Sequence, residues 1–398
     1  PSTLKSPKPS TALLLTPLVA ALATSMPLAA LAQAPIAAPP PLPRTALPVP
    51  AAGWRVYGNK PETQAQPTTS ADGRNLLIQQ ASQRAIYAWK SFDIGADAAV
   101  TFEMAQPGSS ALNRIYSADP SQIFGKLKAT NGGEILLYNR NGILFGKNAQ
   151  VDVGSLVATT LAPKNADYIN GFVSNITGAN PALSIANEKD DPILAGSAGS
   201  AYSGSFVRVD TGTQITTAEG GRIQLYAKRV ENAGALTAPG GQVVLGGGAE
   251  VFYKLPTAEA LYASEANPNV PALRGLLVEV GRADLATGAG KVENTGSISV
   301  PRGNATLVGL AVNQSGRISA TTSVSQNGSI LLLAQGDAGT NDLRNPATIL
   351  TTSSPDYKRA VRSGTLTLAA GSSTEITPDA NGADGKPLTN DDNATFTR

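Results

Sequence analysis

The feature that most constrains the fold is a recurrence with a spacing of about 20 residues in the second half of the chain. Gly-Gly at 220–221 returns at 240–241, and each pair precedes a short alternating run, RIQLYA and then QVVLGG. The segment VENAGAL at 230–236 reappears as VENTGSI at 292–298 and loosely as VNQSGRI at 312–318. A period of this size with short strands is typical of a solenoid. We interpret the unit as 20 residues with two strands.

Further copies extend the pattern towards the end of the chain. GSILLLAQG at 328–336 and GTLTLAAGS at 364–372 look like the strand that follows the glycine turn. One unit is too small to bury its own apolar side chains, so units must stack and pair their strands in parallel, about 4.8 Å per coil. This predicts an all-β, parallel β-helix, with an antiparallel β-sandwich as the alternative. The side chains expected inside include Ile215, Ile223, Leu225, Leu236, Val243 and Leu245.

The densest motif is NGGEILLYNRNGILFGKNAQVDVGSLVATT, residues 131–160. Its apolar runs are separated by turns at 139–142 and 146–150, where Asn and Gly tolerate the left-handed backbone of tight corners and stacked asparagines can bond from coil to coil. Asn-Gly is also the strongest hairpin signal, but the downstream period favours a solenoid corner. Alternation places six side chains inward: Ile135, Leu137, Ile143, Phe145, Val151 and Val153.

The absence of cysteine and histidine excludes several kinds of chemistry. Thiol nucleophiles, disulfides, Cys/His zinc sites and Ser/His/Asp triads all need one of these residues. A β-helix glycan hydrolase or lyase, the enzymatic alternative, needs carboxylates converging within roughly 5–10 Å. The segment DANGADG at 379–385 lacks the closing glutamate of a calcium loop. We expect no enzymatic activity, cofactor or metal, because the acids of the repeats are scattered singly: Glu134, Asp152, Asp210, Glu219, Glu231 and Glu293.

The first residues predict a secretory signal peptide over 1–32. Lys5 and Lys8 precede an apolar stretch, and Ala30-Leu31-Ala32 has the small-x-small form of a cleavage site. Removing two of the 31 basic residues leaves 29 against 29 acidic residues, so we expect no nucleic-acid partner. No other apolar run is long enough to span a bilayer, so we expect no stable membrane insertion.

The remaining chain divides by composition. A Pro/Ala-rich spacer is expected over 33–53 and strands from Trp54 onwards. Excursions from the solenoid are expected near 168–205 and 253–275, and a polar tail or truncation point over 373–398. Trp54 and Trp89 are expected to pack within the coil or its cap.

Two stretches of the chain resemble a known protein family. YNRNGILFGKNAQVDVGSLVATT, at 138–160, resembles the NPNGI-type motif of the amino-terminal secretion domain of filamentous haemagglutinin-like proteins, the exoproteins of two-partner secretion in Gram-negative bacteria. WKSFDIGADAAVTFEMAQPGSSALNRI, at 89–115, resembles the stretch that precedes this motif. The specific similarity gives a secretion domain over 54–165, followed by β-helix repeats over 166–372.

The resemblance implies a right-handed β-helix and a route of export. Such a protein passes through the periplasm, crosses the outer membrane through a dedicated barrel transporter, and commonly acts as a cell-surface adhesin towards a host or bacterial glycan or protein. A structural matrix or filament component is a further alternative. Arg140 stands where the family has proline, and we expect it to point to solvent. The transporter-recognition or coil-nucleating motif maps to Asn139, Asn141, Gly142 and Ile143.

Overall fold

The computed structural model describes residues 41–52, 54, 67–173, 175, 180–190, 205–254, 276–283, 285, 288–322, 328–335 and 364–379. The predicted signal peptide and most of the predicted 253–275 excursion lie outside these residues.

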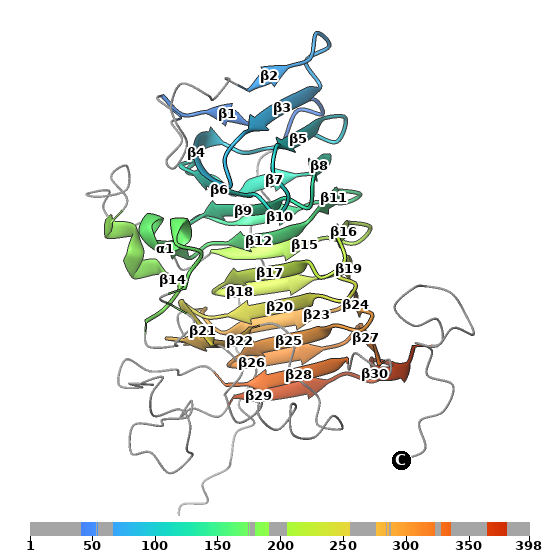
Figure 1. Cartoon of the computed structure of the whole chain (residues 1–398). Helices are drawn as coiled ribbons and strands as arrows, with labels where there is room; N and C mark the ends of the chain where they lie inside the picture. The colour runs from blue at the N-terminus through green and yellow to red at the C-terminus, as the bar shows by residue number, and fades with distance from the viewer. Residues whose placement is uncertain are drawn as a thin grey trace, which may run out of the picture. The chain divides into compact units, whose positions relative to one another are not determined.

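Three sheets wind round a common core, and the strands stack coil upon coil from β3 to β30 (Figure 1). Sheet A holds β1 (Val49–Pro50), β4 (Arg84–Ser91), β6 (Ser110–Ile115), β9 (Glu134–Asn139), β12 (Ser155–Thr159), β17 (Arg222–Ala227), β20 (Gln242–Gly247), β25 (Asn304–Gly309) and β28 (Ser329–Ala334). Sheet B holds β2 (Thr68–Thr69), β3 (Asn75–Gln80), β5 (Ala99–Met104), β8 (Lys126–Ala129), β11 (Gln150–Val153), β16 (Gln214–Thr217), β19 (Ala235–Thr237), β24 (Ser297–Val300), β27 (Arg317–Thr322) and β30 (Ser373–Pro378). Sheet C holds β7 (Ser121–Ile123), β10 (Ile143–Phe145), β15 (Phe206–Val209), β18 (Arg229–Asn232), β23 (Lys291–Asn294), β26 (Ala311–Gln314) and β29 (Thr365–Leu368).

From β6 onwards the chain visits the sheets in the order A, C, B in each coil, and the coils pair in parallel. In the coil that contains the dense motif, β9, β10 and β11 form the three sides, and β12 then pairs with β9 in register from Ser155 opposite Glu134. The prediction of a parallel β-helix is therefore confirmed. The prediction of two strands per unit is wrong: VENAGAL contains a corner, and its two ends belong to β18 and β19.

The two predicted late copies fall on different sheets. Residues 328–336 contain β28, which extends sheet A after a glycine turn as expected. Residues 364–372 contain β29, which pairs with β26 in sheet C, so their assignment to the strand after the glycine turn is wrong. Short alternating strands of sheets A and C carry the same local pattern, and only the pairing partner distinguishes them.

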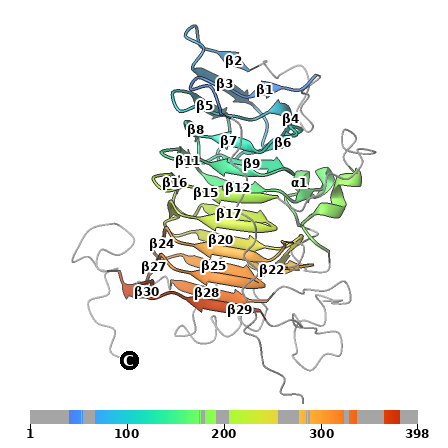
Figure 2. The same cartoon turned by 180° about the vertical axis from the view of Figure 1, so that it is seen from behind.

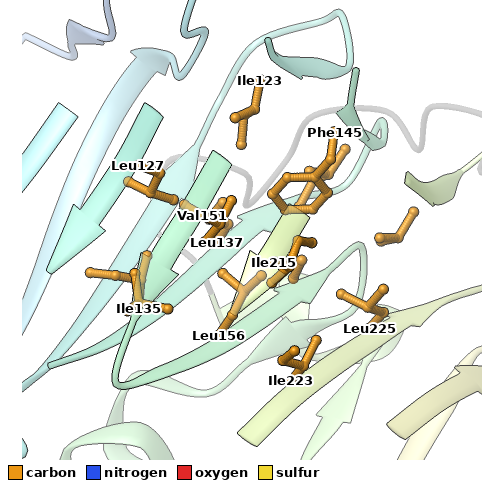
Figure 3. Close-up of a cluster of buried hydrophobic side chains, with 14 of the residues drawn as sticks. Ile123, Leu127, Ile135, Leu137, Phe145, Val151, Leu156, Ile215, Ile223 and Leu225 are labelled. Atoms are coloured by element: carbon orange, nitrogen blue, oxygen red, sulfur yellow. The ribbon is translucent and has the colours of Figure 1, made fainter. Parts of the chain in front are cut away.

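The core inside the coils is built from the side chains that alternation placed inward. Ile135, Leu137, Ile143 and Phe145 are fully buried, and Val151 and Val153 are 2% and 3% exposed. Figure 3 shows several of these residues meeting between the sheets, together with Ile215, Ile223 and Leu225. Leu236, Val243 and Leu245 belong to the same cluster.

Glycine recurs at the corners of the coil because successive coils touch there through backbone. A Cβ on Gly221 would lie 2.0 Å from the carbonyl oxygen of Gly154, and one on Gly241 would lie 1.8 Å from that of Gly221. These glycines sit where sheet B passes into sheet A. Gly316 repeats the arrangement where sheet C passes into sheet B, because a Cβ there would lie 2.0 Å from the carbonyl oxygen of Gly296. The 20-residue spacing of the Gly-Gly pairs is thus the length of one coil, at the end of which the backbones of successive coils come into contact.

The third corner, from sheet A to sheet C, is where the chain leaves the coil. The first excursion, residues 160–205, contains β13 (Ala162–Pro163), α1 (Asn165–Ile169), β14 (Leu183–Ser184) and the 3-10 helix η2 (Ile185–Asp190). The second, residues 248–290, contains β21 (Glu250–Lys254) and β22 (Leu277–Gly281). Both are wider than predicted. Residues 336–363, which also join sheet A to sheet C, lie outside the described residues.

The two excursions cover the outer face of sheet A. Their strands form a small antiparallel sheet D in the order β13, β14, β21, β22. In both Figures 1 and 2, α1 and β22 lie on the side of the stack opposite β16 and β24. Outward side chains of sheet A, such as Leu136 and Val157, join a second buried cluster with Leu183 and Val251. Among the described residues, no helix is long and apolar enough to cross a bilayer.

Both ends of the described stack depart from the predicted organisation. Part of the predicted 33–53 spacer is attached to the first coil, because β1 pairs antiparallel with β4 and Arg44 donates to Asp97 at 2.6 Å. Trp54 stacks on Tyr87 with ring centroids 5.2 Å apart, so its predicted cap packing is confirmed. The predicted 373–398 tail begins with β30, which pairs with β27.

Candidate functional site

The predicted motif forms the corner between β9 and β10. Asn139, the last residue of β9, is fully buried. Its Nδ2 donates to the Asp119 carbonyl and to Ser121 Oγ, both at 3.1 Å, and its Oδ1 accepts from the Asn141 backbone N–H at 2.9 Å. The amide therefore closes its own turn and ties it to the preceding coil.

Asn141 and Gly142 complete the corner in different ways. Half-buried Asn141 donates through Nδ2 to the Ser117 carbonyl at 2.7 Å. Gly142 has a φ of 132°, and a Cβ there would lie 3.1 Å from the Phe206 ring in the next coil. The left-handed backbone predicted for this corner is thus present at Gly142.

Ile143 lies entirely inside the coil. It is fully buried, and it pairs with Ser121 on one side and Val207 on the other. Of the four predicted motif residues, only Asn141 has a partly exposed side chain. The folded motif is consequently a packed corner that presents few of its own groups to solvent.

Arg140 does not point freely to solvent, which corrects the expectation. Its side chain is 17% exposed, and its Nη1 lies 3.8 Å from Oε2 of Glu188 in η2. The other Glu188 oxygen accepts a hydrogen bond from the Tyr138 hydroxyl at 2.6 Å. Arg140 therefore joins the motif to the first excursion. Sequence reasoning missed Glu188 because it lies 48 residues downstream, outside any repeat.

A stacked amide ladder does exist, but at another corner. Asn232 donates to Asn294 at 2.8 Å, and Asn294 donates to Gln314 at 2.7 Å. These residues end β18, β23 and β26, where sheet C passes into sheet B. They are the asparagine or glutamine of the recurring VEN and VNQ segments. The recurrence in the sequence was therefore a signal from which this ladder could have been predicted. At Asn139 the coil-to-coil partner is a serine.

Most acids of the repeats are engaged with a basic side chain. Glu231 pairs with Arg229, Glu293 with Lys291 at 2.8 Å, and Asp210 with Arg208 at 2.6 Å. Within the described ranges, no cluster of three or more acidic side chains could hold a metal ion.

The partial calcium loop begins with a residue that is already paired. Asp379 accepts a hydrogen bond from Arg302 at 2.8 Å. Asn381 and Asp384, its other oxygen donors, lie outside the described residues.

Comparisons with known proteins agree with this architecture. The secretion-domain crystal structure of HMW1 from Haemophilus influenzae matches with a TM-score of 0.51 at 22% identity, covering 69% of this chain and 62% of that chain. At this identity the likeness concerns the fold.

Sequence relatives match over a shorter stretch. Two proteins called heme/hemopexin-binding protein, both from Haemophilus influenzae, are 41% identical over 92 residues and 37% identical over 91 residues. Each match covers 23% of this chain and 10% of the relative, so the matched stretch spans about a tenth of those proteins. The family model of the TPS secretion domain matches residues 56–360, most of the chain. The chain therefore belongs to the TPS secretion domain family, the domain of two-partner-secretion exoproteins.

Proposed function

We propose that this chain directs a secreted exoprotein to a cognate outer-membrane barrel transporter and contributes to adhesion, directly or through further parts of a longer protein. The observation that carries the proposal is the family match over residues 56–360. The proposed route leads from the periplasm of a Gram-negative bacterium to the cell surface.

The covalent and folding properties of the chain support passage through a narrow pore. With no cysteine, it cannot form disulfides that would block threading. Each coil needs only its neighbour for stability, so a β-helix can grow as the chain emerges. The A, C, B order lets each new coil add one strand to every sheet.

We infer that the transporter meets the Asn139–Ile143 motif before the coil closes. In the folded protein the Asn139 amide and the Ile143 side chain are fully buried, so neither is available to a partner. In the unfolded chain both amides and the Ile143 side chain are accessible. Recognition and corner formation can therefore use the same residues in succession.

Secretion with and without the transporter tests the main proposal. Residues 33–398 are expressed behind a periplasmic export signal, with and without the barrel protein, and extracellular protein is measured. We expect secretion only with the transporter. Equal secretion in its absence contradicts the proposal.

A second experiment separates recognition from corner packing. Asn139→Ala and Asn141→Ala are compared with Asn313→Ala, which changes a half-buried asparagine on the outside of sheet C. Each chain is diluted from urea onto the periplasmic part of the transporter, and binding is followed before refolding. Direct recognition predicts weaker capture of the two motif variants; equal capture with reduced folded stability assigns them a packing role alone.

Adhesion and its alternatives need separate assays. Binding of the secreted chain to host and bacterial cells, before and after surface glycan removal, tests adhesion. Incubation with glycans, followed by detection of new reducing ends or unsaturated products, tests the hydrolase or lyase alternative. We do not extend heme binding to this chain, because it has neither histidine nor cysteine, two of the usual iron ligands.

A further inference from the structure

A cavity of about 100 Å³ lies between the outer face of sheet A and the excursions that cover it. Leu136, Val157 and Gln224 stand in one row across β9, β12 and β17, as the strand register requires. Phe172 from the first excursion and Tyr253 from β21 line it from the other side. Apolar side chains of sheet A and of the excursions thus form two facing walls of the cavity.

One buried donor in this cavity has no protein partner. Gln224 is 3% exposed, and its Nε2 makes no hydrogen bond, although its Oε1 accepts from the Tyr253 hydroxyl at 3.4 Å. An unsatisfied buried amide costs about 1–3 kcal/mol. A ligand that offers an acceptor at this point would remove that cost.

The charged groups of the cavity give it a positive balance. Arg84 and Arg222 line it together with Glu134. Glu134 is already compensated, since it accepts from Ser110 Oγ at 2.9 Å and lies 3.6 Å from Arg222. Arg84 donates through Nη1 to the Ile169 carbonyl at 3.2 Å, which fixes its guanidinium beside the first excursion. Arg222 is 41% exposed and marks the solvent side.

We propose that this cavity binds a small organic anion, a carboxylate on a compact apolar body no larger than a benzene ring. Two guanidinium groups and the free Gln224 amide supply donors for the carboxylate, and guanidinium groups suit this geometry. The aromatic and aliphatic walls take the apolar body. The cavity, at about 100 Å³, is smaller than the cavity of about 150 Å³ known to hold benzene, so a benzene ring is the upper limit of the bodies that fit and extends towards the solvent side at Arg222. The site is independent of the secretion motif.

Binding of benzoate to the purified full chain tests the proposal, with uncharged benzamide as the matched probe. Calorimetry or NMR titration should give a dissociation constant of about 1 mM or lower for benzoate. Benzamide should bind roughly tenfold more weakly or worse, because it lacks the charge-assisted hydrogen bonds.

Three variants locate the binding. Arg222→Gln and Gln224→Leu should each weaken benzoate binding roughly tenfold. Arg317→Gln, which removes the same charge from an exposed pair on sheet B, should leave it unchanged. Circular dichroism and melting curves verify that each variant is folded. If Gln224→Leu does not fold, the effect of Arg222→Gln on benzoate binding tests the proposal by itself. Three results would overturn the proposal. They are equal affinities for benzoate and benzamide, equal effects of Arg222→Gln and Arg317→Gln on benzoate binding, and no detectable binding at a benzoate concentration of about 20 mM.

Discussion

At the scale of single residues, the corner at Gly142 is the most demanding position of the motif. Its φ of 132° is unfavourable for any side chain, and Phe206 occupies the adjoining space. We expect Gly142→Ala to lower the free energy of unfolding by about 1–3 kcal/mol. Urea unfolding measures the change. Gly73→Ala is the control, since Gly73 has a φ of 67° with nothing within 4 Å of its Cβ position; a larger loss at Gly73 would contradict the packing argument.

Glu279 in β22 gives a residue-scale dependence on pH. Burial raises its pKa from 4.5 to about 7. Because the folded pKa lies above the unfolded one, the protein loses stability as pH rises from about 4.5 through 7, where the unfolded chain releases the proton first. Glu279→Gln should therefore match the wild type near pH 4 and exceed it by ~1–3 kcal/mol at pH 8. Melting curves across this range measure the difference, and a constant gap at all pH values would refute the assignment.

At the scale of elements, the amide ladder ties β18, β23 and β26 together. Asn294 is fully buried and bonds to Asn232 and Gln314. Asn294→Ala leaves both partners buried and incomplete, so we expect a loss of about 2–3 kcal/mol. Chemical denaturation measures it against Asn313→Ala, one residue before Gln314 on the outside of sheet C. Similar losses in the two variants would mean that the ladder adds no stability.

The first excursion is fastened to the motif by a partly buried ion pair. Glu188 is 8% exposed and contacts both Arg140 and Tyr138. A double-mutant cycle with Arg140→Ala and Glu188→Ala should give a coupling energy of about 0.5–3 kcal/mol. The exposed Arg317–Glu375 pair should couple by less than about 1 kcal/mol. Equal coupling in the two cycles would show that the Arg140–Glu188 pair contributes no more than an exposed ion pair.

At the scale of the whole molecule, the solenoid and its inner core could be predicted because they depend on local alternation and on the recurrence of Gly-Gly and VEN. The third strand per coil was missed, since its corner lies inside a repeated segment. The cover over sheet A was missed because its partners are distant in sequence. The unbroken run Ile135-Leu136-Leu137-Tyr138 was an available signal, since strands buried on both faces lose their alternation. Arg140 could not be placed, because Glu188 lies in an excursion without repeats.

The unequal corners of the coil predict where the molecule accepts new sequence. A ten-residue Gly/Ser insertion after Asn180, an exposed residue of the first excursion between sheets A and C, should leave the melting temperature within a few degrees of the wild type. The same insertion after Gly240 separates backbones in close contact and should lower it by more than about 10 °C. Calorimetry compares the two, and equal melting temperatures would argue against this difference between corners.

That asymmetry also bears on the entropy of loop closure. Both described excursions start and finish at one corner, whose ends are held in place by the adjoining strands of sheets A and C. For a flexible loop anchored in this way, each doubling of length costs only about 0.6 kcal/mol. Segments along this edge can therefore lengthen by tens of residues with little thermodynamic penalty, while the backbone contacts at the other two corners keep the pitch of the coil constant.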